Sequence, residues 1–144
     1  MTRKILVPVD FSPSSDAALD YALTVADQSG AEVEMLHVWT PRSRDADGTT
    51  EIFADTPEGV AMEQRLTAAE SDHPARISGR LEFGDEPSSV ILDILERERF
   101  DLVVMGKEEQ GGHVTESVEK TAPCKVVTTP PPAPTGNEDE TEAA

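Results

Sequence analysis

Residues 4–23, KILVPVDFSPSSDAALDYAL, decide the fold of this chain. The segment opens with a short apolar run, residues 4–10, whose β-branched members are typical of a buried strand. Pro8 is compatible with a central strand only where the chain leaves the sheet. Ser12 then offers a helix N-cap and Pro13 a first helical position, and apolar residues follow at helical spacing. The segment therefore predicts a strand, a tight turn and a helix.

The same alternation of strand and helix patterns continues to residue 129. Period-2 or continuous apolar runs predict further strands, and cap signals followed by helical spacing predict further helices. A polar stretch, residues 40–55, is expected to be a mobile surface loop. The expected strands are residues 31–39, 75–83, 100–105 and 125–129. The expected helices follow Ser12 and Thr56, begin at Pro87, and include Val114 and Val118. Gly30 should end the first helix, the second should run through Ala69, and Gly84 and Pro123 should act as stops.

Strands that alternate with helices in this way indicate one α/β domain. Such an order favours a doubly wound, Rossmann-like parallel sheet with right-handed crossovers and helices on both faces. Ligands of these sheets bind at the carboxyl ends of the strands, where the strand order reverses. The positions just past a strand are Asp10, Trp39, Gly84 and Gly106, and any site should be sought among them.

The charge of the chain excludes several classes of function. There are 29 acidic and 12 basic residues, a formal net charge of −17 at pH 7. Nucleic-acid binding needs Lys and Arg to displace counterions, so neither a nucleic acid nor an anionic membrane is an expected partner. No segment approaches the roughly 20 apolar residues of a membrane span. The charge serves solubility, and it also fits a halophilic surface adapted to a cytoplasm rich in salt.

Two further features bear on organisation and compartment. Residues 130–144, PPPAPTGNEDETEAA, have almost nothing to bury and are expected to form a disordered, acidic, Pro-rich tail, which leaves residues 1–129 as the folded domain. A single cysteine, Cys124, fits a reducing, cytoplasmic location and is read as a small buried hydrophobe. The basic, then apolar N-terminus is expected to be a strand and not a signal peptide.

Four segments together resemble the universal stress protein (UspA) family: KILVPVDFSPSSDAALDYAL, LHVW, DLVVMG and APCKVV, in this order. The resemblance extends over essentially the whole body of the chain. It implies a five-stranded parallel sheet of order 3-2-1-4-5 and a stress-related regulatory role. It also implies a homodimer paired through the last strand, with Lys125, Val126, Val127 and Thr128 at the edge, and an apolar edge of this kind is usually paired or covered.

ATP-binding members of that family carry a loop of the form GxxG, about nine residues, then G followed by Ser or Thr. In this chain Asp10 matches the nucleoside-contacting acid, Val38 the adenine pocket and Gly106 the first loop glycine. Glu109 occupies the place of the second glycine, and His113 replaces the hydroxyl. The residues that the resemblance places around a nucleotide are Pro8, Val9, Asp10, Val38, Met105, Gly106, Gly112, His113 and Val114.

The predicted loop is about half the length that the family pattern requires. Gly106 and Gly112 are six positions apart, against about thirteen in the pattern. A shortened loop cannot wrap a triphosphate in the same way, and Glu108 and Glu109 would repel it. We therefore expect a non-catalytic, homodimeric stress-response module that acts through unidentified protein partners and needs no cofactor. The alternative is an ATP-binding switch or slow ATPase that uses Asp10, Val38 and Gly106, with Mg²⁺ offsetting the carboxylates.

Several other residues have both a functional and a purely structural interpretation. Asp10 could be a nucleoside ligand, an acid of a phosphoacceptor receiver domain in combination with Asp85, or a helix-capping residue. His113, near a helix start, could cap the helix or hold an anion when protonated. The three histidines are scattered through the sequence, so no metal site is expected.

Overall fold

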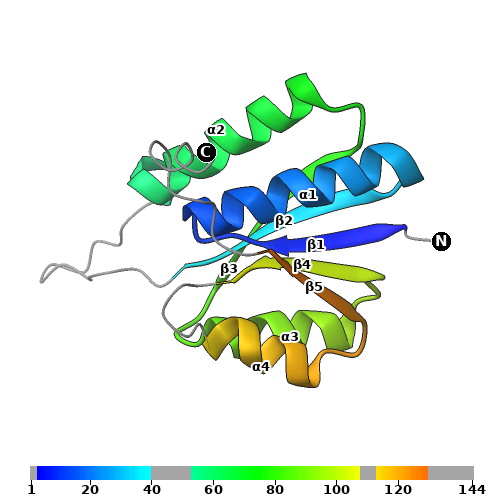
Figure 1. Ribbon diagram of the computed structural model, residues 1–144. Helices are drawn as coiled ribbons and strands as arrows, with labels where there is room; N and C mark the ends of the chain where they lie inside the picture. The colour runs from blue at the N-terminus through cyan, green and yellow to red at the C-terminus, as the bar shows by residue number, and fades with distance from the viewer. Residues whose placement is uncertain (1–2, 40–52, 108–112, 130–144) are drawn as a thin grey trace, which may run out of the picture.

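The computed structural model describes residues 3–39, 53–107 and 113–129. It is a five-stranded parallel sheet of order β3-β2-β1-β4-β5, with helices on both faces (Figure 1). This confirms the predicted fold class and strand order. The strands are β1 (Lys4–Pro8), β2 (Glu32–Trp39), β3 (Ile77–Phe83), β4 (Leu102–Gly106) and β5 (Lys125–Thr129), and the helices are α1 (Pro13–Ser29), η1 (Phe53–Asp55), α2 (Pro57–Asp72), α3 (Pro87–Arg97) and α4 (His113–Thr121).

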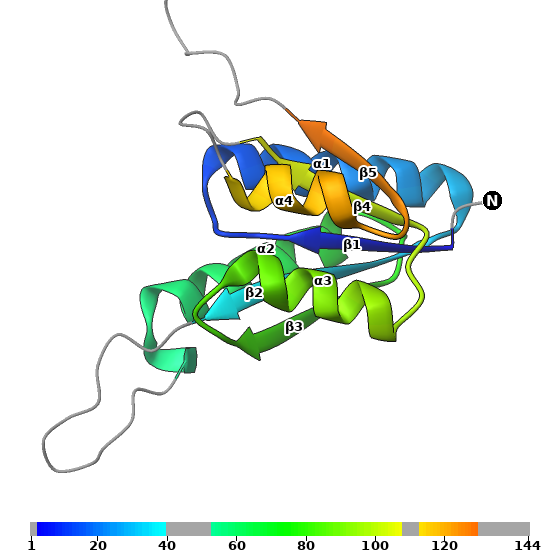
Figure 2. The ribbon, with the colours of Figure 1, turned by 90° about the horizontal axis from the view of Figure 1, so that it is seen from below.

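The strands alternate their side chains between two apolar cores. Ile5 and Val7 of β1 pack into the core under α1 and α2, whereas Leu6 packs into the core under α3 and α4. The central strands β1 and β4 are buried on both faces, as parallel strands between two helical layers must be. Figures 1 and 2 show α1 and α2 on one face of the sheet and α3 and α4 on the other.

The helix boundaries follow the cap signals in the sequence. The Ser12 hydroxyl accepts from the Ser15 N–H at the start of α1, and the Thr56 hydroxyl accepts from the Gly59 N–H at the start of α2. Gly30 ends α1 with a φ of 80°, a left-handed conformation that favours glycine. None of the described helices is long and apolar enough to cross a bilayer.

Some predicted boundaries were wrong. The first strand was expected to reach Asp10 but ends at Pro8, because the chain turns at Phe11, whose φ is 66°. The polar stretch predicted as a loop, residues 40–55, contains the short helix η1 at its end. Helix α2 runs three residues past Ala69, to Asp72. Residues 40–52 and the predicted tail, 130–144, lie outside the described residues.

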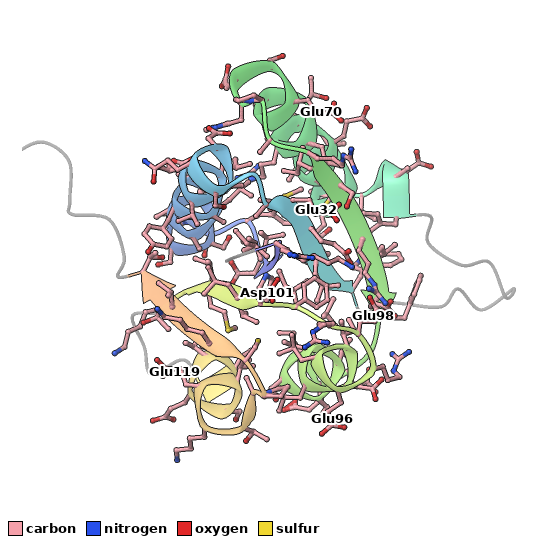
Figure 3. The ribbon with its side chains drawn as sticks, turned by 90° about the vertical axis from the view of Figure 1, so that its right-hand side faces the viewer. Glu32, Glu70, Glu96, Glu98, Asp101 and Glu119 are labelled. Carbon is pink, nitrogen blue, oxygen red and sulfur yellow. The ribbon has the colours of Figure 1, made fainter. Side chains whose placement is uncertain are left out.

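The acidic residues spread over every layer of the fold. Figure 3 shows six labelled acids around the amino ends of the strands, on or beside β2, α2, α3, β4 and α4: Glu32, Glu70, Glu96, Glu98, Asp101 and Glu119. One cation, Arg80, links three of the acidic side chains. The Arg80 guanidinium contacts carboxylates of Glu34, Glu82 and Glu98 at 2.7–2.9 Å. These contacts raise the pKa of Arg80, and they lower the pKa of Glu98 through its hydrogen bonds to the guanidinium. Arg80 therefore ties β3 to β2 and to the end of α3.

Candidate functional site: a cleft at the carboxyl ends of β1, β2 and β4

A cleft of about 120 Å³ opens where β1, β2 and β4 end and where α1, α3 and α4 begin. This is the point at which the strand order reverses, the usual ligand position in an open parallel sheet. Seven of the nine residues singled out in the sequence line it: Pro8, Val9, Asp10, Val38, Met105, Gly106 and Val114. Gly112 lies outside the described residues, and His113 is the first residue of α4.

Asp10 lies on the polar side of the cleft, in the turn between β1 and α1. Its Oδ1 accepts the Ser12 N–H at 3.0 Å, which supports the turn through the left-handed Phe11. Asp10 was also considered as a helix-capping residue, but the N-cap of α1 is Ser12. In the described part of the chain no hydrogen bond engages Asp10 Oδ2, so one carboxylate oxygen is available to a ligand.

The opposite side of the cleft is apolar. Val38 and Val114 are partly buried against the core that contains Leu36, Ile91 and Met105. These side chains come from β2, α3, β4 and α4, and together they form a wall on the α3–α4 side of the sheet. A mostly apolar cleft with a few polar groups at one end is typical of small-molecule sites.

Gly106 has a structural reason to be glycine that the sequence interpretation missed. A Cβ at this position would lie 2.5 Å from the Ser14 carbonyl oxygen and 2.7 Å from the Ser15 nitrogen. The end of β4 therefore packs directly on the first turn of α1. The Gly106 carbonyl also accepts the hydroxyl of Thr115, at 3.0 Å. Gly106 joins three elements at the rim of the cleft, whether or not it contacts a phosphate.

His37 is a second feature that sequence reasoning did not assign to the site. It lines the cleft, is only 8% exposed, and its Nδ1 is 2.9 Å from the Val9 carbonyl oxygen. Its ring is close to those of Phe11 and Phe53, with centroids 4.7 and 5.8 Å away. The available signal was its place in the alternating strand, two residues after Met35 on the inward face.

Other predicted positions do not join the cleft. Trp39 is buried against Phe53 and Phe83, and neither Trp39 nor Gly84 lines the cleft. Asp85 is exposed and also lies outside it, so the acidic pair of a receiver domain is not assembled with Asp10. Within the described ranges, no group of three or more His, Cys, Asp or Glu side chains is arranged to hold a metal ion. The cleft therefore remains the candidate ligand site among the described residues.

Comparison with known proteins agrees with this geometry. The family model for the universal stress protein family matches residues 1–130. Universal stress protein A of Photorhabdus laumondii is 27% identical over 110 residues, which cover 74% of this chain and 77% of that protein. A universal stress protein family protein from Arabidopsis thaliana, solved with AMP bound, superposes with a TM-score of 0.71 at 21% identity, covering 93% of this chain and 97% of that one.

A second solved structure, a universal stress protein in complex with cAMP, superposes equally well. Its TM-score is 0.71 at 19% identity, over 91% of this chain and 98% of the other. At these identities the two structures bear on the fold, whereas the family model matches nearly the whole sequence. The chain belongs to the universal stress protein family.

Proposed function

We propose that this protein is a homodimeric, regulatory stress-response module whose cleft binds an adenine nucleoside or mononucleotide without turning it over. One observation carries the proposal. Asp10 Oδ2, which has no hydrogen-bond partner among the described residues, and the apolar wall around Val38 and Met105 meet in a single cleft at the strand-order reversal. Relatives of the same fold have been solved with AMP and with cAMP, ligands that carry one phosphate each.

The connection after β4 favours a monophosphate over a triphosphate. Residues 107–112 are all that separates β4 from α4, and they include Glu108 and Glu109. Each pair of like charges at 4 Å costs about 1 kcal/mol in water and about 4 kcal/mol at an effective dielectric constant of 20. Each additional phosphate raises the charge that two nearby carboxylates would oppose, so we expect adenosine and AMP to bind better than ATP.

Binding without turnover agrees with how the polar groups of the cleft are used. The Ser12 hydroxyl accepts the Ser15 N–H, the Ser15 hydroxyl contacts the Ser12 carbonyl, and the Thr115 hydroxyl donates to Gly106. A nucleophile needs a base within hydrogen-bonding reach. None of the described hydroxyls of the cleft is hydrogen-bonded to a histidine or a carboxylate. These hydroxyls build the cleft, and we expect none of them to act as a nucleophile toward a ligand.

The position of β5 at one edge of the sheet supports the proposed dimerisation through this strand. In the described part of the chain, β5 pairs with β4 on one side and with no strand on the other. Val126 and Val127 are partly exposed there, and an apolar strand edge of this kind invites pairing with a second copy. Light scattering after gel filtration tests this directly: a dimer is expected, and a monomer at tens of micromolar would contradict it.

The binding proposal is tested by calorimetry at high salt, on protein stripped of any co-purified nucleotide. Adenosine, AMP and ATP with Mg²⁺ are titrated separately into the wild type, Asp10→Asn and Asp20→Asn. Asp20 is an exposed residue of α1 outside the cleft, so its variant makes the same change in charge away from the site. We expect AMP to bind, Asp10→Asn to weaken it and Asp20→Asn to leave it unchanged.

The other outcomes separate the competing functions. Tighter binding of ATP than of AMP, with release of phosphate, would favour the ATP-binding switch or slow ATPase. An absence of heat with all three ligands would contradict adenine binding. It would leave a stress module that acts through protein partners alone.

A further inference from the structure

His37 is a buried polar group of the cleft that the proposed function leaves unused. A carbonyl oxygen can only accept, so the contact with Val9 at 2.9 Å places a hydrogen on His37 Nδ1. In the neutral ring, Nε2 then carries the lone pair. Among the described residues Nε2 has no hydrogen-bond partner, although the side chain is 8% exposed. Buried acceptors are nearly always paired, and an unpaired one in a cleft is a candidate contact for a ligand.

The ring of His37 is held in a fixed orientation. Phe11 and Phe53 flank it, and the Nδ1 hydrogen bond fixes its rotation. Phe11 is held in turn by the Arg65 guanidinium, 5.2 Å from its ring centre, which forms two hydrogen bonds to Asp16. A polar group locked by its surroundings discriminates between ligands better than a mobile one, because binding does not have to order it.

The arrangement of the cleft indicates which ligand group would meet His37. Val38 belongs to the apolar wall on the α3–α4 side, and His37, the preceding residue of β2, lies on the other face of the sheet beside Val9. A base against the wall would place its sugar over the strand ends, next to Asp10 and His37. Sugar hydroxyls are donors, and Nε2 needs a donor.

We propose that His37 Nε2 accepts a hydrogen bond from a ribose hydroxyl of the bound nucleoside, which makes His37 a specificity-determining residue of the cleft. This inference rests on the proposed function, and it adds a sugar requirement and a residue, His37, that is not among the nine residues placed around a nucleotide by the resemblance. A site that hydrogen-bonds a ligand hydroxyl rejects the analogue that lacks it, because the buried acceptor is then left unpaired.

Two substitutions separate the two nitrogens of the ring. His37→Asn places an amide N–H near the position of Nδ1, so it keeps the bond to Val9 and loses the group at Nε2. His37→Gln reaches the position of Nε2 with an acceptor oxygen and loses the bond to Val9. If His37 only supported the turn, Asn would preserve ligand binding and Gln would weaken it. The proposal predicts the opposite order.

The experiment measures adenosine, 2′-deoxyadenosine and 3′-deoxyadenosine binding to the wild type and to both variants by calorimetry. Adenosine is neutral, so the acidic surface does not confuse the comparison. We expect the wild type to bind one deoxy analogue about fivefold to tenfold more weakly than adenosine. His37→Asn should bind adenosine as weakly as that analogue, and His37→Gln should keep part of the preference.

The remaining outcomes contradict either the role of His37 alone or the proposed function as well. Equal binding of all three nucleosides by the wild type, or a sugar preference that survives in His37→Asn, overturns the role of His37 and leaves the proposed function standing. No binding of adenosine by the wild type overturns the inference, and if AMP and ATP do not bind either, the proposed nucleotide binding is overturned as well. A measurement on the wild type alone does not depend on whether the variants fold. The ¹⁵N NMR resonance of His37 Nε2 should shift when adenosine is added and not when the rejected analogue is added, and an unshifted resonance overturns the inference.

Discussion

Replacing Gly106 by alanine tests how closely β4 approaches α1. The new methyl group would lie 2.5 Å from the Ser14 oxygen and 2.7 Å from the Ser15 nitrogen, whereas carbon atoms in contact are about 3.5 Å or more apart. Both obstructing atoms belong to the backbone of the first helical turn, so no side-chain rotation relieves the clash. The start of α1 and the end of β4 would have to separate by roughly 1 Å.

The expected loss of stability follows from two opposing effects. Overpacking of this kind costs about 1–3 kcal/mol, and an obstruction by a backbone peptide group belongs at the upper end. Alanine also restricts the unfolded chain, which offsets about 0.4–1 kcal/mol where the backbone conformation suits it. We expect a net loss of about 2 kcal/mol, which lowers the melting temperature by about 4–8 °C in a chain of this size.

Urea unfolding at constant high salt, followed by circular dichroism and by the fluorescence of Trp39, measures the loss. Two glycines serve as controls. Gly84→Ala meets a single rotatable Val90 methyl group at 2.6 Å, and Gly30→Ala meets no atom within 4 Å but has an unfavourable φ of 80°. Each should cost about 1 kcal/mol, the low end of the range for a left-handed alanine and for a contact that a side chain can relieve. A Gly106→Ala variant within about 0.5 kcal/mol of the wild type would refute the packing argument, since surface substitutions commonly stay within that range.

Three further predictions concern groups outside the cleft. Arg80→Met leaves three glutamates without their shared cation, so we expect the free energy of unfolding to fall by about 2 kcal/mol at low salt. The loss should be smaller at about 1 M salt, where repulsion is screened, and urea unfolding measures it with Arg80→Lys as the charge-retaining control. The backbone N–H groups of Arg3 and Lys4 lower the pKa of Asp101, so its stabilisation is complete above the unfolded-state value of about 4 and is lost as the pH falls through the folded value. Asp101→Asn should thus be less stable than the wild type at pH 7, with a difference that shrinks below about pH 4; a constant difference in pH-dependent urea curves would contradict this. Burial raises the pKa of Cys124, so iodoacetamide at pH 7.5 should modify the folded protein far more slowly than the urea-unfolded chain, and equal rates would exclude a shielded thiol.

The order of the elements could be predicted from the sequence because each one carries a local signal. Ser12, Thr56 and Gly30 are caps whose chemistry acts within three or four residues, and the structure uses all three as expected. The alternation along β2 also placed His37 on the correct face of the sheet. Periodicity and capping are local properties, so a sequence displays them without knowledge of the tertiary fold.

The contacts that decide the site are not local, and sequence reasoning missed them for that reason. Gly106 was interpreted as a phosphate-loop glycine, whereas its neighbour at Ser14 is more than 90 positions away in the sequence. The bond from His37 to Val9 spans 28 positions. Helix η1 was missed because its three residues lie at the end of a polar stretch and are too few to show a period. Distant backbone approaches leave no trace in periodicity or composition.

One short segment connects the cleft to the edge at which we expect the second subunit. Ser14 and Ser15 form the first turn of α1, Ser15 lines the cleft, and the Ser14 carbonyl accepts the hydroxyl of Thr129 in β5 at 3.4 Å. The Thr129 carbonyl in turn accepts the Lys107 N–H at 2.7 Å, where the chain leaves β4. Substitutions at groups that share partners in this way do not add independently. If a ligand in the cleft and a partner at β5 influence each other, the first turn of α1 is a contact that both share, and the coupling must be equal in both directions.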